Sequence, residues 1–225
     1  MVKRASHYIT PATLSAKTAE WLSCVRDSVA PRPHLRIHPA KCGLIVVDML
    51  NYFVSPEGRA FLPAAAVAAT RIERLIEAWR RFGGNIIYTR HCHMDASELG
   101  MLGKFFGDYI RCGEPDAEIA AGLAPQTSDM IIRKTTYDAF LSTGLEEELR
   151  RRELTQVLIA GVLTHLCCET TARSAFCRGF EVYIAADATA SSTERFHLAA
   201  LLGLADGVAV VMSTEEILGE CDRNR

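Results

Sequence analysis

Three side chains able to carry out nucleophilic chemistry stand at the ends of short apolar runs in this sequence. Asp48 follows Leu-Ile-Val-Val, Lys134 follows Met-Ile-Ile-Arg, and Cys167 lies in the loop after Ile-Ala-Gly-Val. A thiolate can attack a carbonyl carbon, a carboxylate can take the thiol proton and pass it to a leaving nitrogen, and an ammonium can stabilise the thiolate. Together the three would form a hydrolytic triad that needs no histidine.

Taken singly, each of these residues has an ordinary structural explanation. An aspartate after an apolar strand is often a helix cap, a lysine there is often a solvated strand end, and a cysteine is more often a packed thiol. The case for chemistry depends on all three meeting in one place, so the elements that carry them decide it.

Those elements alternate along the chain. Apolar runs typical of strands covered on both faces lie at 44–47, 85–89, 130–132, 157–160, 182–185 and 208–212. Helical spacing of apolar residues is found at 64–82, 143–153, 168–178 and 193–204. This alternation predicts an α/β fold with a parallel sheet, in which ligands bind beyond the carboxyl ends of the strands. Asp48, Lys134 and Cys167 all stand at such ends.

Cys167 also precedes the helix expected at 168–178. Unpaired N–H groups and the macrodipole at a helix N-terminus favour a thiolate, and the same N–H groups can bind an oxyanion. We therefore expect Cys167 to be the nucleophile and Asp48 the acid/base. Lys134 is expected to stabilise the thiolate and keep Asp48 ionised, and Cys168 to be a core thiol.

Composition and charge narrow the class of protein and of partner. The 225 residues are 49% hydrophobic and 23% charged, enough for one sizeable core. We expect an N-terminal helix and extended linker over 1–40, a single hydrolase domain over 41–225, and within it an insertion at 94–125 able to cover a site. The formal charge of −2 offers no basic field for nucleic acid or membrane, and no run has the length of a membrane span. The expected partner is a small-molecule substrate, and without a signal-peptide pattern the expected location is cytoplasmic.

The eight cysteines show neither a compact disulfide framework nor a Cys-x-x-Cys pair. We therefore expect reduced thiols, most of them buried, and no structural zinc. A glycine fingerprint for nucleotide phosphates is absent as well. The sequence predicts a protein that works without a cofactor.

Three motifs resemble those of the isochorismatase-like cysteine hydrolase superfamily, which includes isochorismatases, nicotinamidases and N-carbamoylsarcosine amidohydrolases. They are VVDMLNYF (46–53), RKTTYDAF (133–140) and GVLTHLCCETTARSAF (161–176), and the stretch AADATASSTERFHLAAL (185–201) is similar too. The resemblance covers roughly residues 40–218. It implies a Cys–Asp–Lys triad in a Rossmann-like three-layer fold, with six parallel strands in the order 3-2-1-4-5-6.

The resemblance has further implications for assembly and for the nucleophile loop. Members of the superfamily are often homodimers or homotetramers. They are similar in placing a non-proline cis peptide before the nucleophile, which here would join Val162 and Leu163. The amides of Leu163 and Cys167 would then form the oxyanion hole.

The residue at the nucleophile position separates the chemistries of the family. Cys167 stands where true isochorismatases typically carry glycine and where the amidohydrolases carry cysteine. The resemblance therefore implies hydrolysis of a C–N bond in a small amide, carbamoyl or ureido compound through a thioester. The alternative is hydrolysis of an isochorismate-like vinyl ether, with Asp48 as general acid and Cys167 as a bystander. His165 and Leu166 resemble isochorismatases and keep that alternative open.

The stretch Thr-Arg-His-Cys-His (89–93) follows the second expected strand. In nicotinamidases the matching stretch supplies an aspartate and a histidine to a metal. Here His91 replaces that aspartate and only His93 matches, so we expect pocket-lining residues and no metal. Arg90 is expected either to clamp a substrate carboxylate or to pair with a surface acid.

Four more side chains are candidates for substrate contact. Phe53, Phe105 and Phe106 could form an apolar wall above the thiol, with ordinary core or oligomer contacts as the alternative. His165 could contact substrate, although a role in structuring the loop is the reading we prefer.

Overall fold

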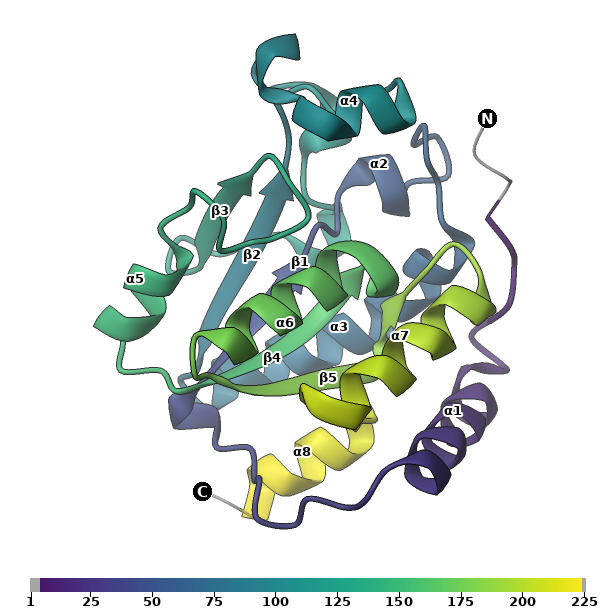
Figure 1. Cartoon of the computed structure of the whole chain (residues 1–225), viewed down its shortest axis with the longest axis vertical. Helices are drawn as coiled ribbons and strands as arrows, with labels where there is room; N and C mark the ends of the chain where they lie inside the picture. The colour runs from purple at the N-terminus through teal and green to yellow at the C-terminus, as the bar shows by residue number, and fades with distance from the viewer. Residues whose placement is uncertain (1–4, 224–225) are drawn as a thin grey trace.

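A six-stranded, all-parallel sheet organises the chain (Figure 1). In the computed structural model, which describes residues 5–223, the strands lie in the order β3-β2-β1-β4-β5-β6. Their bounds are β1 Cys42–Val47, β2 Asn85–His91, β3 Met130–Lys134, β4 Gln156–Val162, β5 Glu181–Ala190 and β6 Ala209–Met212. Every run predicted to be a strand is one, and the predicted fold class and strand order are confirmed.

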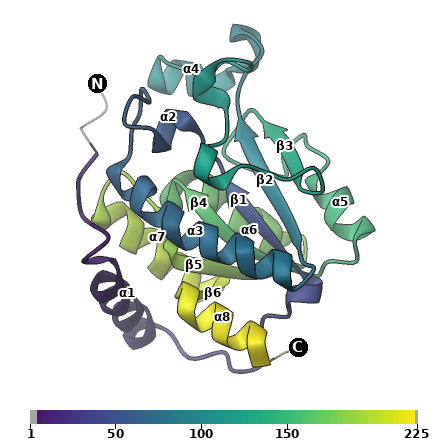
Figure 2. The ribbon, with the colours of Figure 1, turned by 180° about the vertical axis from the view of Figure 1, so that it is seen from behind.

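Helices cover both faces of the sheet, with α5, α6 and α7 on the face seen in Figure 1 and α3 and α8 on the face seen in Figure 2. The α-helices are α1 Leu14–Ser28, α2 Asn51–Val54, α3 Pro63–Arg81, α4 Gly100–Phe106, α5 Leu145–Arg151, α6 Glu169–Cys177, α7 Glu194–Gly207 and α8 Thr214–Arg223. Short 3-10 turns lie at Pro39–Lys41, Ala96–Glu98, Pro115–Ala117 and Ala121–Leu123. None of the helices within residues 5–223 combines the length and apolarity needed to cross a membrane.

The predicted helices over 64–82, 143–153, 168–178 and 193–204 correspond to α3, α5, α6 and α7. Helix α3 illustrates the cause: Ile72, Leu75 and Trp79 recur at helical spacing and are fully buried, while Arg and Glu fill the outer positions. Helix α8 was not predicted, because its short run of Thr, Glu and Cys lacks a long apolar stripe. Helix α1 matches the helix expected near the N-terminus and packs against α7.

The strand order places the switch point of the sheet beside β1. The chain runs from β1 to β2 and β3 on one side and then returns to β4 on the other. Loops leaving β1 and β4 therefore diverge and leave a crevice at their carboxyl ends. Asp48 follows β1, and the loop bearing Cys167 follows β4, so the topology alone places both at this crevice.

Gly161 lets β4 approach β1 more closely than a side chain would allow. Its φ is +116°, and a Cβ built on it would lie 2.1 Å from the carbonyl oxygen of Val47.

We expect Gly161→Ala to lower the free energy of unfolding by about 2 kcal/mol or more, measured by urea denaturation. Gly207→Ala, at a position with nothing within 4 Å of the added Cβ, is the control and should change it by less than about 1 kcal/mol. Equal losses in the two variants would contradict this account.

Candidate active site

Asp48 is the first residue beyond β1 and is completely buried. It adopts φ +48°, in the left-handed region that is uncommon for residues other than glycine. The Thr89 hydroxyl accepts a hydrogen bond from the Asp48 N–H at 3.0 Å and donates one to Asp48 Oδ1 at 2.6 Å. A single side chain on β2 thus fixes both the backbone and the carboxylate of Asp48.

Lys134 ends β3, and its ammonium group lies within 3.3 Å of four polar atoms. Its Nζ is 2.7 Å from Asp48 Oδ2 and 2.8 Å from the carbonyl oxygen of Thr136. Cys167 Sγ and His91 Nδ1 each lie 3.3 Å from the same nitrogen. Strand register produces this contact, because His91 and Lys134 are paired directly across β2 and β3. The structure therefore brings the three predicted triad residues together.

Cys167 sits in a tight turn between β4 and α6. The turn, Thr164–Cys168, is π-helical, and Leu163 immediately before it is joined to Val162 by a cis peptide bond, as the resemblance implied. The carbonyl oxygen of Leu163 accepts hydrogen bonds from the N–H groups of Leu166 and Cys168. The Cys167 side chain is turned inward, since the residue is only 6% exposed. Cys168 is a fully buried core thiol, as expected.

Burial and charge give the triad a defined protonation state. Burial raises the pKa of Asp48, but the positive charge of Lys134 and the hydrogen bonds from Lys134 and Thr89 together lower it by more, so the pKa is lowered overall. Burial lowers the pKa of Lys134, but the charge of Asp48 and the contacts with Asp48 and Cys167 together raise it more, so the pKa is raised overall. Burial raises the pKa of Cys167 to about 12, more than Lys134 lowers it. These shifts favour an ion pair between Asp48 and Lys134 beside a neutral Cys167 thiol as the resting state.

His91, at the end of β2, and His93, two residues later, lie in different surroundings. Burial, followed by the charge of Lys134, lowers the pKa of His91 to about 4, so its ring is neutral. Asp48, His91 and Cys167 offer ligand atoms within 4.8 Å of one another, the one such group in the described part of the chain. These residues do not fit a metal ion, because the Lys134 ammonium already contacts all three. His93 is bonded to the carbonyl oxygen of Thr135 at 3.0 Å instead.

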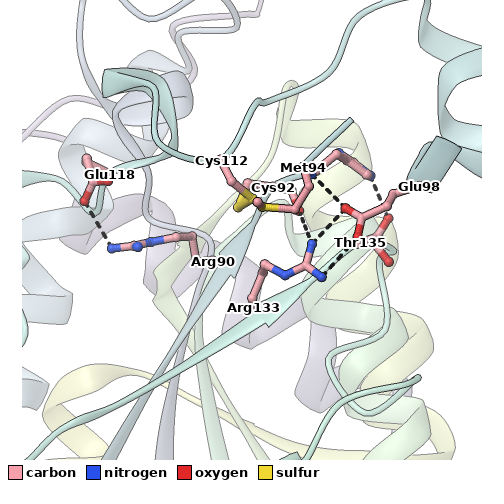
Figure 3. Close-up of a disulfide and its surroundings, with 9 residues drawn as sticks. Arg90, Cys92, Met94, Glu98, Cys112, Glu118, Arg133 and Thr135 are labelled. Carbon is pink, nitrogen blue, oxygen red and sulfur yellow. Dashed lines mark hydrogen bonds and ion pairs between the residues drawn. A yellow bond between two sulfur atoms is a disulfide. The ribbon is translucent and has the colours of Figure 1, made fainter. Parts of the chain in front are cut away.

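The cysteine between these histidines corrects another expectation. Cys92 forms a disulfide with Cys112, with Cα atoms 5.1 Å apart, so not all cysteines are reduced thiols (Figure 3). The pairing arises because the insertion over 94–125 returns to the segment that follows β2, where His93 forms a parallel bridge with Arg111. The two cysteines are 20 residues apart and meet only because the loop folds back, so their spacing in the sequence did not indicate a disulfide. The disulfide ties the insertion to the edge of the site.

Two arginines reinforce this attachment (Figure 3). Arg133 pairs with Glu98 at 2.8 Å, and Arg90 pairs with Glu118 at 3.1 Å. Of the two roles expected for Arg90, pairing with a surface acid is the one that the structure displays.

The four other side chains predicted to contact substrate differ in where they lie. Phe53 lies half-buried on α2, against the core. Phe105 is 79% exposed and Phe106 44% exposed on α4, where the rings pack on each other. The expected wall above the thiol is thus not formed by these two residues, because α4 projects from the body of the fold (Figure 1). His165 is bonded to Ser191 Oγ at 2.5 Å and stacked on Phe196, which fits the preferred role in structuring the loop.

Sequence reasoning missed three residues at the site. Thr89 orients Asp48, and the carbonyl oxygen of Thr136 binds Lys134. Tyr137 lies near the thiol, and its pKa is raised by burial and then by Cys167. Thr89 could have been predicted from the sequence, because it places a hydroxyl group at the end of an otherwise apolar run. The contact with the Thr136 carbonyl oxygen could not have been predicted, because every residue type has a backbone carbonyl.

Removal of the buried ammonium should leave an uncompensated buried carboxylate. We expect Lys134→Met to lower the free energy of unfolding at pH 7 by about 3–5 kcal/mol. Lys41→Met removes an exposed lysine and should change it by less than about 0.5 kcal/mol. Urea denaturation of both variants tests this, and a loss no larger than that of the control would show that the ion pair adds little to stability.

The Thr89 hydroxyl should contribute a stability term that depends on pH. Since the folded pKa of Asp48 is lowered, its contribution is present above the unfolded value of about 3.9 and is lost as pH falls through the folded value. We expect Thr89→Val to be less stable than wild type by about 1.5–3 kcal/mol near pH 7. The difference should shrink as pH falls below about 4. Unfolding curves over this range test the sign, and a difference that grows toward low pH would contradict it.

Comparison with known proteins agrees with this geometry. A family model for the isochorismatase domain matches residues 42–216. Nicotinamidase 3 of Arabidopsis thaliana is 37% identical over 177 residues, which cover 77% of this chain and 85% of that protein. The isochorismatase of Bacillus subtilis is 28% identical over 183 residues, 81% of this chain and 58% of that protein. A crystal structure of a cysteine hydrolase from Pseudomonas syringae pv. phaseolicola superimposes with a TM-score of 0.84 at 28% identity, covering 87% of this chain and 99% of that one. The resemblance inferred from the motifs is thereby confirmed, and the chain belongs to the isochorismatase family as an enzyme of the cysteine hydrolase type.

Proposed function

We propose that this enzyme hydrolyses a C–N bond of a small amide, carbamoyl or ureido compound through a thioester on Cys167. The observation that carries the proposal is the position of Lys134 Nζ, 2.7 Å from Asp48 Oδ2 and 3.3 Å from Cys167 Sγ. It keeps the carboxylate ionised next to a neutral thiol. An ionised carboxylate is ready to accept a proton, whereas protonation of a vinyl ether would require Asp48 to carry one at the outset.

The proposed acylation begins as Asp48 takes the thiol proton and Cys167 Sγ attacks the carbonyl carbon. The carbonyl electron pair moves to the oxygen, where the N–H groups of Leu163 and Cys167 donate hydrogen bonds to the oxyanion. Lys134 stabilises the sulfur as its charge develops. When the oxyanion collapses, the C–N bond breaks, the leaving nitrogen takes the proton from Asp48, and the thioester remains.

Deacylation reverses the roles with water in place of the thiol. Asp48 takes a proton from water, and the oxygen attacks the thioester carbonyl. Collapse of this second oxyanion breaks the C–S bond and releases the acid. The sulfur takes the proton back from Asp48, which restores the resting ion pair and neutral thiol.

Two observations bear on the substrate. Cys167 is only 6% exposed, which favours a small acyl group. The 37% identity to a nicotinamidase makes a primary amide, nicotinamide first, the compound class to test before carbamoyl and ureido compounds. His91, which contacts Lys134, is the residue we propose to line the substrate pocket nearest the triad, with Phe53 further out.

Intact-mass spectrometry of wild type and Cys167→Ala, with product release followed in parallel, tests the proposal. The panel holds nicotinamide, N-carbamoyl and ureido acids, and isochorismate. We expect an acyl adduct on wild type only, and a loss of turnover in Cys167→Ala of at least about 1,000-fold. Cys177→Ala, which removes an exposed free thiol, is the control and should keep wild-type turnover.

A second candidate function follows from the similarity to the Bacillus subtilis isochorismatase. In it, Asp48 protonates a vinyl ether and the thiol takes no part. Isochorismate turnover that survives Cys167→Ala, without any adduct on wild type, would establish this second function and refute the thioester.

A further inference from the structure

The turn that bears Cys167 is braced by part of the chain that precedes the matched family domain. That domain begins at Cys42, yet residues 5–28, here termed the N-terminal brace, reach the loop between β5 and α7. The Tyr8 hydroxyl accepts a hydrogen bond from the Ser191 N–H at 3.0 Å. The Ser6 N–H donates to the carbonyl oxygen of Ser192 at 2.9 Å. Figure 1 shows α1, which ends the brace, lying beside α7.

The brace also covers His197, a buried histidine of α7. The Trp21 ring meets it edge-on with centroids 4.4 Å apart, and the Tyr8 ring lies at 6.0 Å. His197 is fully buried, and burial lowers its pKa to about 3, so its ring is neutral. It therefore acts by hydrogen bonding and packing, and adds no charge to the triad.

His197 in turn contacts the first residue of the nucleophile turn. Its Nδ1 lies 2.8 Å from Thr164 Oγ1, and both residues are fully buried. Thr164 directly follows Leu163, whose carbonyl oxygen accepts two hydrogen bonds of the turn. Because both groups are buried, no water can take the place of a lost hydrogen-bond partner. We therefore expect the turn to shift when this hydrogen bond is removed.

The next residue of the turn is fixed from the same side. His165 is bonded to Ser191 Oγ at 2.5 Å and stacked on Phe196 with centroids 4.6 Å apart. Ser191 is the residue whose N–H is bound by Tyr8. Two consecutive residues of the turn are thus attached to α7 and the loop before it, and the brace is attached to both of those.

We propose that His197 is a positioning residue for Cys167, acting through Thr164, and that the N-terminal brace holds His197 and Ser191 in place for this role. Cys167 Sγ must stay 3.3 Å from Lys134 Nζ, and small displacements of a reacting group lower its rate steeply. The inference rests on the proposed role of Cys167 as nucleophile.

Thr164 offers a matched pair of substitutions. Thr164→Val keeps the shape and removes the hydroxyl, whereas Thr164→Ser keeps the hydroxyl and removes a methyl group. Alkylation of Cys167 by iodoacetamide is followed against pH and assigned by peptide mapping, since Cys24 and Cys177 are exposed. We expect Thr164→Val to slow it about ten-fold and to move its pH profile upward, because the sulfur moves away from Lys134. Thr164→Ser should stay within about three-fold of wild type.

Hydrogen exchange of the peptide spanning 163–168 gives a second measurement that needs no reactive thiol. Exchange should be faster in Thr164→Val and in Tyr8→Phe, and unchanged in Thr164→Ser. Glu20→Gln, on the exposed side of α1, is the control for the brace and should match wild type in both measurements.

The outcomes separate this inference from the proposed function. If Thr164→Val matches wild type in alkylation and in exchange, the positioning role is wrong even where Cys167→Ala is inactive. If Tyr8→Phe behaves as Glu20→Gln does, the brace has no part in it. Turnover that persists in Cys167→Ala refutes the thioester instead, and exchange of the turn still decides whether His197 and Thr164 fix its position.

Discussion

The buried ion pair between Lys134 and Asp48 is the constraint on which the rest of the site depends. Both side chains are fully shielded from solvent, and burying two charges is unfavourable unless geometry and further hydrogen bonds satisfy them. Thr89 supplies one such bond to the carboxylate, and the Thr136 carbonyl supplies another to the ammonium. Because these groups come from β1, β2 and β3, the pair forms only when the three strands keep their register.

The same pair explains why the proposed nucleophile, Cys167, would rest as a thiol. With Asp48 ionised, Lys134 charged, and Cys167 and His91 neutral, the buried cluster carries no net charge. A resting thiolate would add an unpaired negative charge to a site without solvent. Transfer of the proton from Cys167 to Asp48 moves the negative charge within the cluster and leaves the total unchanged. In the proposed mechanism, the carboxylate would therefore serve both as the base and as the negative charge that the sulfur replaces.

The sequence was sufficient for features that depend on one strand or one motif. The apolar runs predicted all the strands, and the strand ends predicted that Asp48, Lys134 and Cys167 would meet. Features that depend on tertiary contact were not predictable in the same way. The protonation state of Cys167 follows from how deeply its turn is buried, and the Cys92–Cys112 disulfide follows from the path of a returning loop. The exposure of Phe105 likewise follows from the outward course of α4.

The insertion over 94–125 is attached to the fold at both of its ends. The disulfide and the bridge between His93 and Arg111 secure one end, and the bridge between Leu50 and Ile119 secures the other. Residues 94–110 form the loop closed by the disulfide and the His93–Arg111 bridge, and they supply none of the triad. Substitutions in this loop can therefore accumulate while the triad stays unchanged, so the outer surface of the insertion can diverge independently of the triad.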